Sequence, residues 1–191
     1  MRKREPSYDD RRRALLGGLH GGILEIGPGR GANLAIYPTD VCWIGIEPDR
    51  SRHRALMRAA AGLGRKVEIR EGTAEQLDLA DASFDAVVST RVLCSVRDPV
   101  RVLEEIVRVL KPGGRFVFLE HVAAPDGTRL RRFQQFIQPL WTAIDGACRP
   151  DREIGRAIEG AGFTTVEMER FSATLGLPGL RFPHIAGIAT K

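Results

Sequence analysis

Short apolar runs alternate with helical patterns along most of the chain. The apolar runs predict strands at about 22–26, 41–46, 66–70, 84–89 and 114–120. The clearest helical pattern spans 98–110, where Asp98 can cap the first turn, Pro99 suits that turn, and apolar residues recur at helical spacing. Strands that alternate with helices predict a parallel sheet with helices on both faces.

Other helices are expected between and beyond these strands. Ser7 can cap the first of them, and the rest are predicted at 30–37, 49–61, 129–146 and 151–160. Pro139 predicts a bend or break in its helix, and the KPGG turn at 111–114 reverses the chain into the fifth strand. Two apolar runs, 163–170 and 184–190, follow the last helix. Because no further crossover is available, the final strand should pair antiparallel.

The length of the chain fits one domain. A single domain at 1–191 leaves no room for a separate substrate-binding domain, and residues 1–20 are interpreted as its helical extension. The apolar stretches are strand-length, far short of the ~20 residues that cross a bilayer. The N-terminal MRKREPSYDDRRR has no apolar core for a signal peptide. A cytoplasmic location without a transmembrane segment is therefore expected.

Charge and cysteine content narrow the classes of partner. The net charge of +5 comes from arginines scattered over the termini and helix faces. This distribution favours attraction for an acidic substrate or a peripheral membrane contact over specific binding of nucleic acid. The three cysteines, Cys42, Cys94 and Cys148, show no C-x-x-C spacing, so neither a disulfide framework nor a metal site is expected. Nothing in the pattern indicates an oligomeric state.

The richest motif is the ILEIGPGRGAN segment at 23–33. An apolar strand runs through Glu25 into the alternate glycines Gly27, Gly29 and Gly31, and 20 residues after the first of these a second strand ends in Glu47. The glycines permit a tight turn with positive φ and let backbone N–H groups approach a ligand. An acid at the tip of the next strand can accept both hydroxyls of a ribose. The arrangement predicts a site for an adenosine nucleoside.

Two cofactor classes use such a turn. A pyrophosphate prefers G-x-G-x-x-G at a helix N-terminus, whereas this turn reads G-x-G-x-G with Pro28 inside it and Glu25 two residues before the first glycine. A carboxylate there would repel a pyrophosphate and would suit a ligand that bears an ammonium and a sulfonium. S-adenosylmethionine is favoured, with an NAD-binding module as the alternative.

Several motifs in order carry a family resemblance. With Glu25, the glycine turn, Glu47, the FDAVVS strand, the KPGG turn and a terminal hairpin, the chain resembles class I S-adenosylmethionine-dependent methyltransferases over about 20–191. The segments EIGPGRGANLAIYP, RVLCSVRDPVRVLEEIVRVLKPGG, EHVAAP and RFPHIAGIA are similar to the methyltransferase-like seven family of alkyl thiol methyltransferases. The resemblance implies a Rossmann-like α/β fold with a seven-stranded, mostly parallel sheet and an antiparallel last strand. Animal members carry an apolar membrane anchor that this sequence lacks, so their membrane location is not transferred.

The resemblance also implies roles for individual residues. Glu25 and the backbone from Gly27 through Pro28 to Gly31 should hold the methionine portion of the cofactor, and Glu47 the ribose. The remaining residues expected at the cofactor are Pro48, Thr73, Ala74, Glu75, Thr90 and Arg91. Of these, Pro48 could cover one face of the adenine. Quinone-methylating relatives have Asp where this chain has Thr73, so adenine recognition would rest on the Ala74 backbone and Glu75.

The acceptor side is expected at the carboxyl ends of the strands. That rule selects Glu120 and His121 after the fifth strand, and the antiparallel last strand should bring His184 to the same edge. His121 and His184 are the candidates for a proton acceptor, with a structural histidine as the alternative for each. Three aromatic side chains at helical spacing could wall an apolar pocket or belong to the core, namely Phe133, Phe136 and Trp141.

These observations predict an S-adenosylmethionine-dependent enzyme that methylates a small molecule. A thiol is the leading acceptor because its pKa near 8.5 leaves a few per cent ionised at neutral pH. The alternatives are O- or C-methylation of a phenol or quinone and a non-catalytic subunit that binds S-adenosylmethionine. Methylation of adenine in nucleic acid is disfavoured, because STRV stands at 89–92 where such enzymes resemble one another in an Asn-Pro-Pro-aromatic motif.

Overall fold

A computed structural model describes residues 4–145, 148–149, 151–174 and 181–191, and within the first range gives the backbone alone for 139–145. The helices are α1 (Tyr8–Leu16), α2 (Arg50–Gly62), α3 (Pro99–Val109), α4 (Arg129–Asp145) and α5 (Ile154–Glu159). The strands are β1 (Gly22–Ile26), β2 (Cys42–Ile46), β3 (Glu68–Arg70), β4 (Phe84–Thr90), β5 (Leu110–His121), β6 (Thr165–Thr174) and β7 (Arg181–Thr190).

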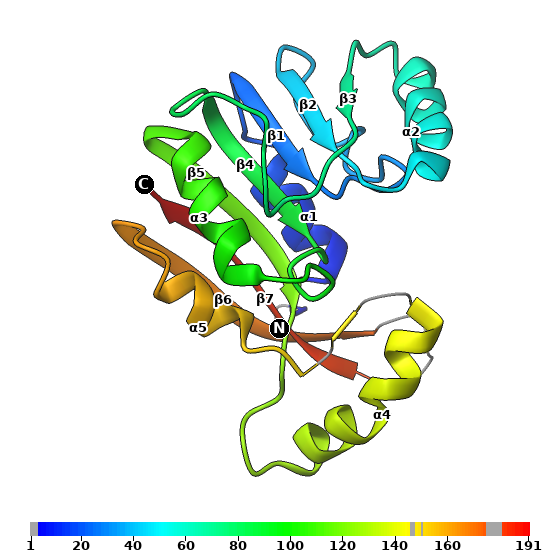
Figure 1. Cartoon of the computed structure of the whole chain (residues 1–191), viewed down its shortest axis with the longest axis vertical. Helices are drawn as coiled ribbons and strands as arrows, with labels where there is room; N and C mark the ends of the chain where they lie inside the picture. The colour runs from blue at the N-terminus through cyan, green and yellow to red at the C-terminus, as the bar shows by residue number, and fades with distance from the viewer. Residues whose placement is uncertain (1–3, 146–147, 150, 175–180) are drawn as a thin grey trace.

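All seven strands form one sheet. Their order is β3-β2-β1-β4-β5-β7-β6 (Figure 1), and β7 runs antiparallel to both of its neighbours while the other pairs are parallel. The predicted fold class, with its antiparallel last strand, is confirmed. The strands of this sheet come from segments between 22 and 190, and α1 lies within 1–20; the single domain stays a prediction.

Helices cover both faces of the sheet. On one face α3 and α5 bury Leu103, Ile106 and Ile158 against strand residues, and on the other α1 and α2 bury Leu16 and Leu56. In Figure 1 α1 lies behind the sheet, α3 and α5 lie in front of it, and α4 projects beyond the edge at which β5 ends. Successive strand side chains alternate between the two layers, as a strand buried on both faces requires.

The helix starts follow the sequence closely. Ser7 and Asp10 form a reciprocal capping box on α1, Asp49 caps α2 by accepting from the Ser51 N–H, and Asp98 accepts from two N–H groups at the start of α3. Each cap satisfies backbone donors that lack a partner inside the helix. These three helices therefore begin within a residue of their predicted positions, whereas α5, predicted from 151, begins at Ile154.

Two local predictions were wrong. Residues 30–37 form consecutive turns and no regular helix, with bonds that span three residues, such as the Leu34 N–H to the Gly31 carbonyl at 3.1 Å. The KPGG segment is an irregularity inside β5, where Gly113 has φ +75°, so the fifth strand begins at Leu110 and not after this segment. Helix α4 continues past Pro139 as one helix, so of the predicted bend or break the break is absent.

Candidate active site

The glycine turn connects β1 to the turns that follow it. Gly27, Gly29 and Gly31 have φ of +59°, +58° and +85°, a region that side chains with a Cβ disfavour. A Cβ on Gly27 would lie 2.7 Å from Val92, and one on Gly31 would lie 2.7 Å from Leu56. A Cβ on Gly29 would meet no described atom within 4 Å, so the middle of the turn faces open space.

Glu25 lies beneath this turn and is fully buried. Its carboxylate accepts hydrogen bonds from Asn33 Nδ2 at 2.8 Å, the Tyr37 hydroxyl at 2.8 Å and Trp43 Nε1 at 3.1 Å. Burial raises the pKa of Glu25, and the three donors oppose that shift by stabilising the carboxylate. In the structure Glu25 binds the side chains of Asn33, Tyr37 and Trp43 beneath the glycine turn. Its contact with the cofactor stays a prediction.

Glu47 follows β2 and is also buried. One of its oxygens accepts the Gly29 N–H at 2.8 Å, and the other accepts the Asp49 N–H at 3.0 Å. Each oxygen keeps a second lone pair, so ribose hydroxyls could still donate to it. Pro48, next in the chain, is exposed.

The loop between β3 and β4 carries the residues predicted at the adenine. Thr73 is exposed, Ala74 is buried, and Glu75 accepts the Arg97 N–H at 2.8 Å. The loop is therefore tied at Glu75 to the segment that leads into α3.

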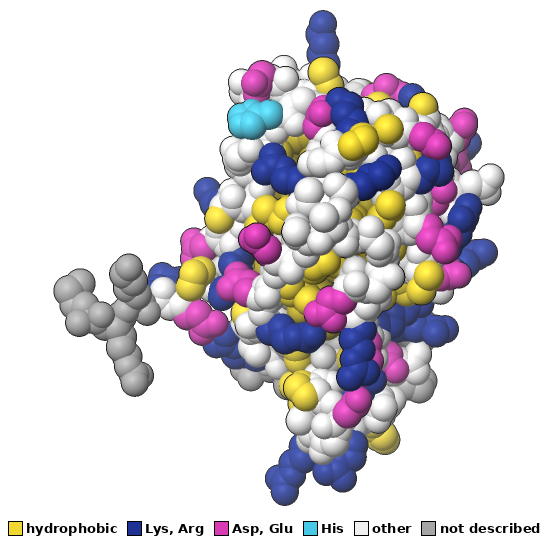
Figure 2. Space-filling model, turned by 90° about the vertical axis from the view of Figure 1, so that its left-hand side faces the viewer, with side chains coloured by type: hydrophobic (Ala, Val, Ile, Leu, Met, Phe, Trp, Pro, Cys, Tyr) yellow, Lys and Arg dark blue, Asp and Glu magenta, His cyan; other side chains and the backbone are white. Residues whose placement is uncertain are grey.

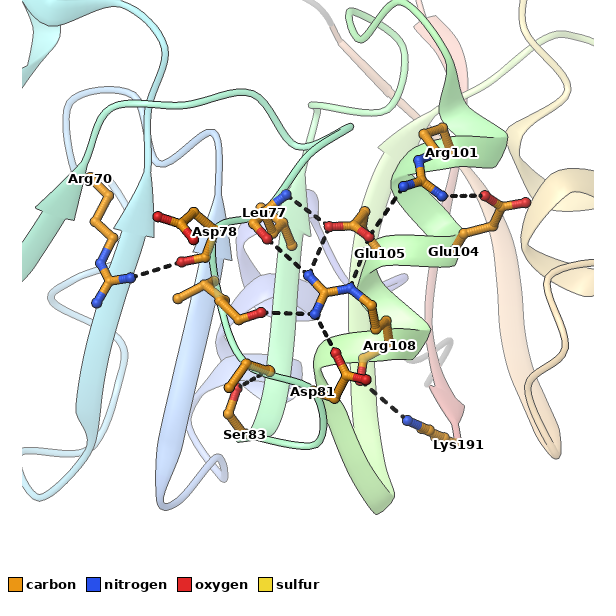
Figure 3. A network of polar contacts seen from close by, with 12 residues as sticks. Arg70, Leu77, Asp78, Asp81, Ser83, Arg101, Glu104, Glu105, Arg108 and Lys191 are labelled. Carbon is orange, nitrogen blue, oxygen red and sulfur yellow. Dashed lines mark hydrogen bonds and ion pairs between the residues drawn. The ribbon is translucent and has the colours of Figure 1, made fainter.

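A polar network holds the rest of this loop (Figure 3). Glu105 of α3 accepts the Leu77 N–H at 2.8 Å. Arg108, one turn further on, donates to the carbonyls of Leu77 at 2.9 Å and Leu79 at 2.8 Å. Its guanidinium also pairs with Glu105 and with Asp81. The network holds the loop between β3 and β4 against α3, and so fixes the position of the residues predicted at the adenine.

Thr90 and Arg91 close the end of β4. The Thr90 hydroxyl accepts from Asn33 Nδ2 at 3.0 Å, so the same amide joins β4 to Glu25 of β1. Arg91 is exposed and has φ +56°, unusual for a residue with a side chain. Its guanidinium lies 5.5 Å from the centre of the Tyr8 ring in α1.

The two candidate histidines lie side by side. His121 of β5 and His184 of β7 are register partners, both are buried, and their ring centres are 5.6 Å apart. Among the described residues neither Nε2 has a hydrogen-bond partner. Phe171 and Phe182 flank the pair, with ring centres 5.5 Å from His184 and 5.7 Å from His121 respectively.

The protonation of His184 follows from its surroundings. Its Nδ1 lies 2.9 Å from the Phe182 carbonyl, which can only accept, so Nδ1 carries the proton. Burial lowers the pKa of His184 to about 4, which keeps the ring neutral at pH 7. Its Nε2 therefore presents a lone pair.

Glu120 and Tyr8 are two further titratable groups near the histidine pair. The carboxylate of Glu120 accepts from the Ser89 hydroxyl and from the N–H groups of Val92 and Leu93. Burial raises the pKa of Glu120 to about 7 and that of Tyr8 to about 12. The Tyr8 ring meets His184 edge to face at 5.7 Å, so α1 covers the edge of the sheet that carries the histidines.

Comparison with known proteins now decides the family. Residues 24–118 match the methyltransferase domain family. The chain is 37% identical to thiol S-methyltransferase TMT1A of Homo sapiens over 173 residues, which is 88% of this chain and 70% of that protein. Thiol S-methyltransferase TMT1B of Homo sapiens is also 37% identical over the same shares. The chain belongs to the methyltransferase-like seven family.

A solved structure gives the same fold. The YcgJ protein from Bacillus subtilis superposes on this methyltransferase with a TM-score of 0.73 at 17% identity, covering 96% of this chain and 95% of that one. The chain is therefore an S-adenosylmethionine-dependent methyltransferase of class I, and the predicted family, enzyme class and cofactor are confirmed.

The methyltransferase has a side-chain cluster that sequence spacing did not reveal. Cys94 is buried with its Sγ 3.5 Å from the Sγ of Cys148, and the Cys148 Sγ lies 4.0 Å from His121 Nδ1. The cysteines are 54 positions apart, so no local motif contains them both. The only available signal was that each lies near the end of a predicted element.

The predicted aromatic wall is not formed by the described side chains of α4. Phe133 is 39% exposed and Phe136 is 83% exposed, and Trp141 lies outside the described side chains. Among the described residues, no helix combines the length and the apolar composition that crossing a membrane requires.

Proposed function

We propose that this methyltransferase methylates the sulfur of a small thiol. The carrying observation is the pair of buried imidazoles at the strand-end edge, each with an unpartnered Nε2 among the described residues and flanked by aromatic rings. The names of the relatives, thiol S-methyltransferases at 37% identity, support the same acceptor class.

The residues of the turn and the neighbouring loops would hold the cofactor. The open space at Gly29 is a cradle that a Cβ would narrow, and the free lone pairs of Glu47 suit ribose hydroxyls. Backbone groups around Ala74 and the side chain of Glu75 would meet the adenine, with Pro48 exposed nearby in the chain. When bound, S-adenosylmethionine supplies a methyl group on a positively charged sulfur.

The surroundings of the histidines favour a thiolate acceptor. A thiolate that approaches a sulfonium neutralises charge, so a dry, apolar site favours the transition state over the separated ions. Phe171 and Phe182 exclude water from one side of the imidazoles, and Tyr8 from another. Alignment of the two reactants in such a site can lower the barrier by about 7–11 kcal/mol.

The low pKa of His184 makes this residue a weak proton acceptor. Its pKa of about 4 lies some 4.5 units below that of a free thiol, so full proton transfer would cost about 6 kcal/mol. We therefore assign His184 Nε2 to accept a hydrogen bond from the acceptor and to position its sulfur. His121 remains the second candidate for contact with the acceptor.

The test is a panel of small thiols, phenols and quinones incubated with enzyme and methyl-labelled cofactor. The proposal expects label on sulfur, with thiols favoured at least about tenfold in kcat/KM. Label on oxygen or carbon would establish the runner-up acceptor class. Binding of S-adenosylhomocysteine without turnover of any acceptor would support a non-catalytic role.

A small molecule also fits the surface charge. On the face shown in Figure 2, Lys and Arg side chains are interspersed with Asp and Glu, a pattern that does not favour a phosphate backbone. The cytoplasmic location, the absence of specific nucleic-acid partners and a peripheral membrane contact stay predictions from the sequence.

A further inference from the structure

Three potential metal ligands come together beside the proposed acceptor site. The Sγ atoms of Cys94 and Cys148 and one ring nitrogen of His121 all lie within 4.8 Å of one another, and all three residues are buried. They come from the loop after β4, from the segment after α4 and from the end of β5. The fold therefore brings together three residues that are far apart in the sequence.

Backbone hydrogen bonds hold the cluster in place. The Arg149 N–H donates to the Cys94 carbonyl at 2.8 Å, and the Ala123 N–H donates to the Arg152 carbonyl at 2.8 Å. Arg152 Nη1 also donates to the Leu93 carbonyl at 2.9 Å. The residues that follow Cys148 are thus fastened to the segments next to the other two ligands.

The distances suit one small thiophilic ion. Zn–S bonds of about 2.3 Å and Zn–N bonds of about 2.0 Å at tetrahedral angles place two sulfurs about 3.8 Å apart and a sulfur and a nitrogen about 3.6 Å apart. The observed separations of 3.5 and 4.0 Å differ from these by a few tenths of an ångström. The two sulfurs form no disulfide, because their separation of 3.5 Å is far longer than the ~2.05 Å of an S–S bond.

We propose that Cys94, His121 and Cys148 bind one zinc ion and leave its fourth coordination position open. Two thiolates would balance the charge of a divalent cation, and sulfur with imidazole nitrogen is the ligand set that zinc prefers. No fourth His, Cys, Asp or Glu joins the group among the described residues. Nearby Glu120 already accepts from Ser89 and two backbone N–H groups. Three protein ligands with one open position are typical of catalytic zinc.

The open position gives the acceptor a place to bind, a step that rests on the proposed function. A thiol that coordinates zinc releases its proton to solvent and remains as a bound thiolate. An incoming thiol could donate its S–H to His184 Nε2, and once it is bound as a thiolate the metal and the aromatic rings would position it. Binding of the ion itself releases one further proton from each cysteine.

The first test measures binding without any turnover. Purified enzyme, stripped with a chelator and kept under a phosphine reductant, is titrated with Co²⁺ and then with Zn²⁺. We expect one ion per chain, a thiolate-to-cobalt charge-transfer band and its loss when zinc displaces cobalt. Cys94→Ser and Cys148→Ser should each weaken binding by more than about 100-fold, whereas Cys42→Ser, at an exposed cysteine, should bind as the unmodified enzyme does.

Several outcomes would overturn the site. They are the absence of the charge-transfer band in the unmodified enzyme, equal binding by Cys94→Ser, and formation of a Cys94–Cys148 disulfide as the only change under mild peroxide. The unmodified enzyme is decisive even where a variant fails to fold.

The second test separates this inference from the proposed function. Addition of a thiol that the enzyme methylates should shift the cobalt spectrum, and a phenol should not. A cobalt spectrum unchanged by thiols overturns the open position. Metal binding by an enzyme that methylates only phenols would retain the ion site and overturn the proposed function.

Discussion

Glu47 accepts the backbone N–H of Gly29 at 2.8 Å, so the acid after β2 and the middle glycine of the turn form one unit. Two residues that sequence reasoning assigned to different parts of the cofactor, the ribose and the methionine, thereby depend on each other. A change at Glu47 should alter the turn as well as the proposed ribose contact.

Glu47→Ala should weaken binding of S-adenosylhomocysteine. Loss of a charge-assisted interaction of about 1.5–3 kcal/mol corresponds to about 10 to 150-fold in affinity. Calorimetric titration measures it, and Glu71→Ala, which removes an exposed acid that pairs with Arg50, is the matched control. Unchanged affinity in Glu47→Ala would contradict the ribose assignment.

Gly29→Val should abolish cofactor binding. The new side chain would occupy the open space above the turn and would force a β-branched residue to φ +58°. Gly64→Val is the control, because Gly64 also has a positive φ, +64°, with open space around it, but lies in the loop after α2. Both variants carry the backbone strain, so equal cofactor affinity in the two would place the cofactor elsewhere.

Glu105→Ala should lower the free energy of unfolding by about 2–3 kcal/mol, because the Leu77 N–H loses its acceptor and Arg108 loses a partner. Affinity for the cofactor should fall as well, since the loop with Thr73 to Glu75 loses an anchor. Denaturant unfolding and calorimetry measure the two effects. Glu104→Ala, at the exposed neighbour, should stay within about 0.5 kcal/mol. Equal effects of the two changes would argue against the anchor.

Tyr8 should make stability fall at high pH. Its pKa is raised from 10.0 to about 12 in the folded enzyme, so its contribution is complete below pH 10 and is lost as the pH rises through 12. The loss amounts to about 2–3 kcal/mol. Tyr8→Phe should remove this part of the pH dependence, seen as a smaller drop in melting temperature between pH 9 and pH 11. A drop as large as that of the unmodified enzyme would show that Tyr8 is not buried against the histidine pair.

His184→Gln should lower turnover of a good thiol by about 100-fold, which is the lower end of the range for general acid–base residues. The effect is at the lower end because an imidazole with a pKa of about 4 positions the thiol and does not take its proton fully. Affinity for the cofactor should be nearly unchanged, and a higher pH should restore part of the rate by supplying thiolate. His20→Gln, at an exposed histidine, should behave as the unmodified enzyme. Wild-type turnover by His184→Gln at pH 7 would make His184 structural.

The sequence predicted most of the fold because its signals were local. The apolar spacing that includes Leu103 and Ile106 lies within α3, and the cap at Asp98 directly precedes it. The turns at 30–37 were mistaken for a helix because apolar spacing also suits a coil that packs against a core. Here Leu34 and Tyr37 are buried, yet bonds that span three residues replace the helical pattern.

The sequence predicted the positions of candidate site residues only where the order of strands and turns along the chain determines them. Gly29 and Glu47 follow from a strand, a turn and a strand, and His121 and His184 follow from the antiparallel last strand. The approach of Cys94 to Cys148 depends on the path of the chain through and after α4, which no spacing rule encodes. The partners of Glu25 depend likewise on how the turns at 30–37 pack.

The insertion of β7 between β5 and β6 sets an order on assembly. During synthesis β5 and β6 emerge before β7, and among the described strands β6 pairs with β7 alone. The edge of β5 that carries His121 must wait, unpaired, until residues 181–190 arrive with His184. A nascent chain can thus pair β1 to β5 early, whereas the two histidines meet only after residues 181–190 have left the ribosome.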